Sequence, residues 1–90
     1  MHRIPKNNIK QILGVNVKLE FPRKIDNGES VGESDSDNNI IRIASGLKLQ
    51  VKQETLIHEE IHFISDKLNL DLTESQVQGL TIGILSILKR

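Results

Sequence analysis

The chain has 90 residues, 37% of them hydrophobic and 2% aromatic, and its formal net charge at pH 7 is zero. Such a chain forms one domain with a modest core, to whose stability a bound metal or a partner would add. The balanced charge argues against a nucleic-acid-binding protein. Because cysteine is absent, disulfides, thiolate zinc sites and cysteine nucleophiles are excluded.

Neither end of the sequence resembles a targeting or membrane segment. The first residues lack the apolar run of a signal peptide, and the C-terminal apolar stretch is too short and too mixed to span a bilayer. We therefore expect a cytoplasmic protein without a membrane partner. Basic residues gather before residue 25 and acidic residues between 25 and 38, which we interpret as solvated surface.

The N-terminal half predicts a short helix and then strands. Residues 1–14 are predicted to contain the helix, because Pro5 suits a first turn and Gly14 can end the helix. Residues 15–44 are predicted to form the strands and a hairpin. The alternation at 15–21, a polar segment at 30–35 and a β-branched run at 40–44 are typical of strands.

Two helices are predicted in the C-terminal half. Residues 50–69 carry an apolar face beside a polar stripe, and residues 73–88 begin with a capping box formed by Thr73 and Gln76. The expected fold class is therefore α+β, with a small antiparallel sheet packed on the first of these helices and on the C-terminal helix.

A His-Glu-x-x-His motif lies in the middle of the first of these two helices. His58 and His62 are four residues apart, so both imidazoles project from one side of the helix and can hold one zinc ion. Glu59 is offset around the helix, where it can reach a water on the metal without ligating it. The motif predicts a zinc site with Glu59 as the general base.

A catalytic zinc site needs a third protein ligand. Four residues are candidates: Glu74, Asp66, Asp71 and His2. We assign Glu74, which begins the last helix on the side of its apolar stripe, and keep Asp66 as the alternative. Asp66 also suits a role as hydrogen-bond acceptor for an imidazole, and Glu60 is interpreted as a surface or structural residue.

Residues 57–62, together with the preceding hairpin and the capped helix carrying Glu74, resemble the zincin-like metallopeptidases. The likeness is closest to small zincin-like proteins of phages and mobile elements, related to the ImmA/IrrE-type group, and it covers residues 30–90. It implies a zinc-dependent peptidase that aligns an extended peptide on a sheet edge. Larger members steady the oxyanion with a Tyr or a third His; this chain has no Tyr, and Arg42 and Lys67 are the candidate replacements.

We therefore expect a zinc metallopeptidase that hydrolyses a peptide bond in a protein substrate. The alternative is a non-catalytic binding or inhibitory module that uses the same fold, and a third is an accessory protein whose histidines are incidental. A homodimer is a further expectation, because a chain this small leaves apolar surface and an edge strand exposed.

Overall fold

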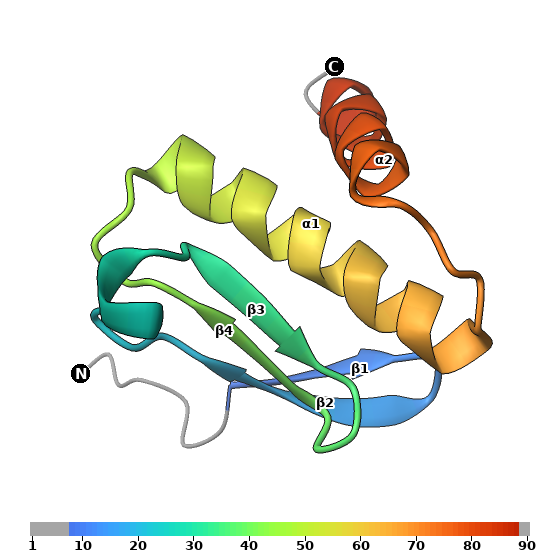
Figure 1. The fold of residues 1–90 in the computed structure, drawn as a ribbon, viewed down its shortest axis with the longest axis horizontal. Helices are drawn as coiled ribbons and strands as arrows, with labels where there is room; N and C mark the ends of the chain where they lie inside the picture. Colours follow the sequence, from blue (N-terminus) through green and yellow to red (C-terminus); the bar gives the residue numbers. More distant parts are fainter. Residues whose placement is uncertain (1–7, 89–90) are drawn as a thin grey trace.

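The structure, a computed structural model, describes residues 8–88. It is a small α+β domain with a four-stranded mixed sheet and two helices (Figure 1). Its elements in chain order are β1 (Ile9–Ile12), β2 (Val15–Glu20), the 3₁₀ turn η1 (Asp26–Gly28), β3 (Gly32–Asp35), β4 (Ile40–Ile43), α1 (Leu49–Leu68) and α2 (Glu74–Leu88).

The sheet is mixed, so the prediction of an antiparallel sheet is wrong. The strand order is β1-β2-β4-β3, in which β1–β2 and β3–β4 are antiparallel hairpins and β2 pairs with β4 in parallel. The chain between β2 and β4 is long enough to hold η1 and β3, so β4 can return alongside β2 in the same direction. The pattern of apolar residues defines strands but not their direction.

The helix predicted within residues 1–14 is a strand in the part that the structure describes; residues 1–7 lie outside that part. Leu13 and Gly14 both have positive φ, as a two-residue type I′ hairpin turn requires, and they join β1 to β2. Gly14 therefore turns a hairpin instead of ending a helix. A helix this short is marginal in water, whereas a strand obtains its hydrogen bonds from β2.

The core lies between the sheet and α1. One face of the sheet contributes Val17, Ile41 and Ile43, and α1 contributes the fully buried Phe63. Figure 1 shows α1 lying across this face of the sheet. The hydrophobic contacts thus fix the rotation of α1, and with it the side on which its histidines project.

The second helix, α2, forms a third layer that packs on α1, so the expectation that the sheet also packs on the C-terminal helix is wrong (Figure 1). Helix α1 covers the apolar face of the sheet and separates α2 from it. It buries Val77 and Thr81, while five of its large apolar side chains stay exposed: Leu80, Ile82, Ile84, Ile87 and Leu88. The homodimer expected from exposed apolar surface and an edge strand stays a prediction. Within residues 8–88 no helix has the length and apolarity needed to cross a membrane.

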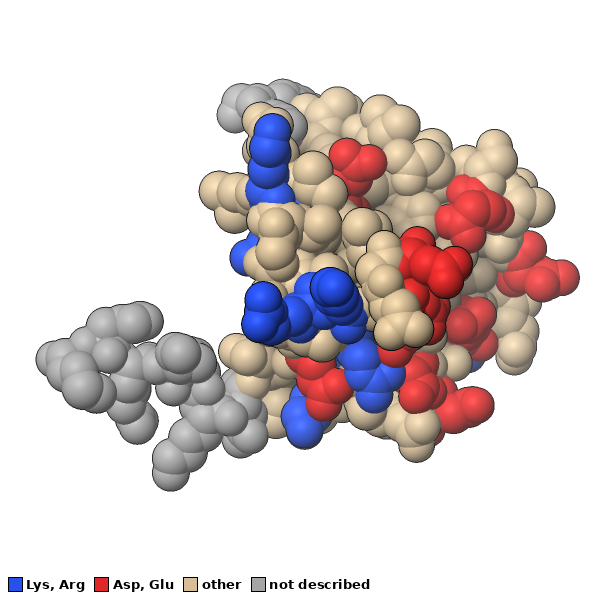
Figure 2. Space-filling model, turned by 60° about the vertical axis from the view of Figure 1, so that its left-hand side comes forward, with Lys and Arg blue, Asp and Glu red and all other residues tan. Residues whose placement is uncertain are grey.

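The other face of the sheet carries ion pairs. Arg42 of β4 binds Glu20 of β2 at 2.8 Å and Glu33 of β3 at 2.5 Å, and Lys18 lies 3.4 Å from Glu20. Figure 2 shows Lys and Arg gathered on one part of the surface and Asp and Glu on another. On this face of the sheet, ion pairs link the three neighbouring strands β2, β4 and β3.

Candidate metal centre

Helix α1 presents its two motif histidines on the side that faces α2. Phe63 and Thr55 anchor the helix on the sheet, and both are buried. His58 and His62 follow one turn apart, with 19% and 26% of their side chains exposed and ring centroids 4.9 Å apart. The rings therefore lie side by side at the α1–α2 interface.

The link between the helices brings Glu74 to these rings. Asn69 caps the C-terminal end of α1, and its left-handed conformation turns the chain. The backbone N–H of Leu72 then donates to the buried Ser65 hydroxyl at 3.1 Å. Thr73 and Gln76 then form the capping box, each donating a backbone N–H to the other's side chain, at 2.9 and 3.1 Å. Glu74 is the first residue of α2 and stands beside the histidines.

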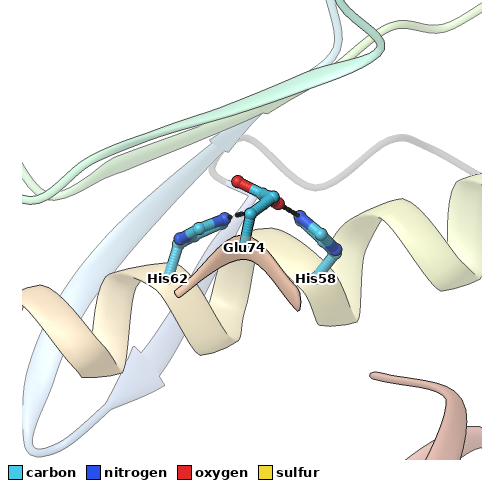
Figure 3. Close-up of side chains that lie close together, drawn as sticks. All are labelled: His58, His62 and Glu74. Atoms are coloured by element: carbon cyan, nitrogen blue, oxygen red, sulfur yellow. Dashed lines mark hydrogen bonds and ion pairs between the residues drawn. The ribbon is translucent and has the colours of Figure 1, made fainter. Parts of the chain in front are cut away.

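Three ligand atoms converge at this point (Figure 3). Oε1 of Glu74 lies 2.5 Å from Nε2 of His58 and 3.2 Å from Nε2 of His62. The possible ligand atoms of the three residues lie within 4.8 Å of one another. Two imidazole nitrogens and one carboxylate oxygen form the ligand set of many catalytic zinc sites.

The cluster is electrostatically suited to a cation. A carboxylate only accepts hydrogen bonds, and the unprotonated nitrogen of a neutral imidazole also carries a lone pair. Without protons on these nitrogens, three electron-rich atoms would face one another. Hydrogen bonds from His62 and His58 accordingly hold the pKa of Glu74 below its usual value of 4.5. A metal ion would replace those protons, so the three residues fit zinc.

Glu59 lies apart from the three ligand atoms and lines a pocket that His58 also lines. Burial raises the pKa of its carboxyl above 4.5, and the nearby His62 and His58 partly oppose that rise. Its side chain packs against Gly32 of β3, where an added Cβ would lie 3.0 Å from Cγ of Glu59. This position, next to the ligands but outside their set, suits a proton acceptor.

Two contacts made by Gln78 were not predicted from the sequence. Oε1 of Gln78 lies 2.9 Å from Nδ1 of His58, and Nε2 of Gln78 donates to Oε2 of Glu54 at 3.1 Å. Gln78 lies one turn after Glu74, and Glu54 one turn before His58. This i, i+4 spacing on both helices is the signal that could have identified them.

The other residues considered from the sequence lie elsewhere. Asp66 is exposed and borders a surface hollow with Asp71, and neither joins the metal-ligand group. His2 lies outside the described residues. Glu60 pairs with Lys10, which agrees with its structural interpretation.

The two residues suggested as oxyanion-stabilising groups, Arg42 and Lys67, make contacts away from the site. Arg42 pairs with Glu20 and Glu33 on the far face of the sheet. The ammonium group of Lys67 lies 5.5 Å from the centroid of the Phe63 ring. Neither residue therefore reaches the pocket that Glu59 and His58 line.

Comparisons with models of known protein families, with curated proteins and with solved structures found no match.

Proposed function

We propose that the protein is a zinc-dependent hydrolase with a zincin-like centre, acting on a peptide bond of a protein substrate. The observation that carries the proposal is the convergence of His58, His62 and Glu74 from two helices on one point. These residues would hold the metal. A bound zinc would supply the Lewis acidity that activates a water and polarises a carbonyl.

Glu59 would act as the general base. Its carboxylate would accept a proton from the attacking water and deliver that proton to the leaving amine. It lines the same pocket as His58, beside the proposed metal position, which supports this role. The bond that breaks is the amide C–N bond, and the water oxygen forms the new bond to the carbonyl carbon.

The pocket supports a peptide as the substrate. It is an open cavity of about 530 Å³ between α1 and the chain leading into β3. Strand β3 lies at the edge of the sheet, so a backbone edge borders the pocket and can pair with an extended peptide. The lining includes Glu29, Glu54 and Glu59 but no Lys or Arg, which favours neutral or basic peptide segments.

A non-catalytic binding module is the second candidate, and a specific observation favours it. No Lys, Arg or Tyr lines the pocket, so among the described residues no cationic side chain would steady an oxyanion there. In such a module the metal would join α1 to α2, and the pocket would hold a partner without cleaving it.

Glu59→Gln separates the two candidates. We would incubate the zinc-loaded protein with a library of fluorogenic peptides and compare wild type, Glu59→Gln and chelator-treated wild type. An enzyme should lose about 10²–10⁴-fold in turnover in the variant while keeping its zinc. Cleavage that survives in Glu59→Gln would remove the general-base assignment, and a wild type that binds peptides but cleaves none would favour the binding module.

A further inference from the structure

A series of hydrogen bonds between side chains runs from Glu54 through Gln78 to His58. It reaches His58 on the side of the ring that faces away from Glu74. Gln78 Nε2 donates to Glu54 at 3.1 Å, and Gln78 Oε1 lies 2.9 Å from His58 Nδ1. Both contacts are partly buried, so water competes with them only weakly. These hydrogen bonds cross between the helices twice, because Glu54 and His58 belong to α1 and Gln78 belongs to α2.

Glu54 determines which groups donate and which accept in this series of hydrogen bonds. A carboxylate can only accept, so the group of Gln78 that faces Glu54 must be its NH₂. The carbonyl oxygen of Gln78 then faces His58, and an oxygen there can only accept a hydrogen bond. Nδ1 of His58 must therefore carry the proton, which leaves the lone pair of a neutral ring on Nε2.

We propose that Glu54 and Gln78 are positioning residues that hold His58 as its Nδ1-protonated tautomer and so direct its Nε2 lone pair toward the metal. This inference rests on the proposed zinc centre. Without the two residues, a neutral His58 can carry its single proton on Nε2 and donate it to Glu74, whose Oε1 lies 2.5 Å away. That internal hydrogen bond would occupy both ligand atoms and compete with zinc. With the two residues present, the Nδ1 proton is committed to Gln78, so a hydrogen bond from Nε2 to Glu74 needs a second proton on the ring, and a metal ion would take that proton's place.

The test is the zinc affinity of matched variants, measured by competition with a chromophoric chelator. Gln78→Met removes the acceptor at nearly constant length and should weaken zinc binding about 10–100-fold. Glu54→Met breaks the same chain from α1 and should also weaken binding, so the test does not depend on the folding of a single variant. The matched control is Gln53→Met, which changes an exposed glutamine beside Glu54 and should bind zinc as wild type does.

Exchanging the two residues between positions 54 and 78 tests the direction of the hydrogen bonds separately from the packing of the side chains. In Glu54→Gln combined with Gln78→Glu, the amide at position 54 donates to the carboxylate at position 78, which still accepts from His58 Nδ1–H. This variant should recover zinc affinity to within a few-fold of wild type. Imidazole ¹⁵N spectra of the zinc-loaded wild type and double variant should show a protonated Nδ1 and a metal-bound Nε2 in His58.

The outcomes separate this proposal from the proposed function. If Gln78→Met and Glu54→Met bind zinc as tightly as wild type, the positioning role is wrong and the metal centre stands. If wild type binds no zinc, both are wrong. If the variants weaken zinc binding but wild type hydrolyses no peptide, the positioning role stands and only the catalytic proposal fails.

Discussion

Nε2 of His58 in α1 lies 2.5 Å from Oε1 of Glu74, the residue that begins α2. The contact joins two helices whose shared interface buries little else from α2 beyond Val77 and Thr81. A metal bound at this point would therefore cross-link α2 to α1.

If the protein binds zinc as proposed, removal of the metal should destabilise α2 more than the sheet. Binding at 100 times the dissociation constant stabilises the bound state by about 2.7 kcal/mol, and opening of α2 alone would forfeit that energy. Hydrogen exchange followed with and without a chelator should show faster exchange in α2 and little change in β2 and β4. Equal protection of α2 in both conditions would contradict a metal that joins the helices.

Glu59→Gln should stabilise the metal-free protein at neutral pH. Burial raises the pKa of Glu59 above 4.5, so ionisation is less favourable in the folded than in the unfolded chain. The contribution of the neutral carboxyl to the free energy of unfolding is fully present below pH 4.5. It is lost as the pH rises through the raised pKa of the folded protein. The variant cannot ionise, so its advantage should be present at neutral pH and disappear in acid.

Urea unfolding in the presence of a chelator, repeated from acid to neutral pH, measures this difference in the free energy of unfolding. Glu29→Gln, at an exposed position in the same pocket, is the control and should change stability little. A wild type that is as stable as Glu59→Gln at neutral pH would show that burial of this carboxylate carries no cost.

Gly32→Ala should destabilise the fold and disturb the pocket. An added Cβ would lie 2.6 Å from Cγ2 of Thr55 and 3.0 Å from Cγ of Glu59, so α1 or β3 must shift. Overpacking of this kind costs about 1–3 kcal/mol. Gly46→Ala is the matched control because its Cβ meets open space. Thermal unfolding that ranks the two variants equally would show that β3 and α1 are not in this close contact.

Thr73→Ala should weaken both α2 and zinc binding. The Thr73 hydroxyl accepts the backbone N–H of Gln76, and loss of such a cap costs about 1 kcal/mol. Because Glu74 follows the cap directly, fraying of this turn should also displace the proposed zinc ligand. Chelator competition and urea unfolding should both respond in Thr73→Ala but not in the neighbouring Ser75→Ala. Unchanged zinc affinity would mean that the cap does not position Glu74.

The helices and the ligand group could be predicted from local signals. A long apolar period identified α1, the Thr73–Gln76 box located the start of α2, and the motif with Glu74 named the three residues that the structure brings together. The motif and the capping box each operate within a few residues of the chain, where spacing on a helix determines which side chains are neighbours. The choice of Glu74 over Asp66 depended instead on how the two helices dock.

The strands at the N-terminus and their directions depended on distant partners. Residues 9–12 form a strand because β2 pairs with them, and β4 can lie parallel to β2 because the long connection between them, which holds η1 and β3, lets the chain return in the same direction. The contacts of Gln78 were missed for a similar reason: the i, i+4 spacing places Gln78 on the same side of α2 as Glu74, but its pairing with His58 and Glu54 depends on how the two helices dock.

The most direct test of the account is the zinc content of the purified protein, measured by elemental analysis beside His62→Ala. The account predicts one zinc ion per wild-type chain, retained through dialysis against weak chelators, and a loss of zinc from the variant while the sheet stays folded. A folded wild type without zinc that also fails to bind zinc when it is supplied would contradict it.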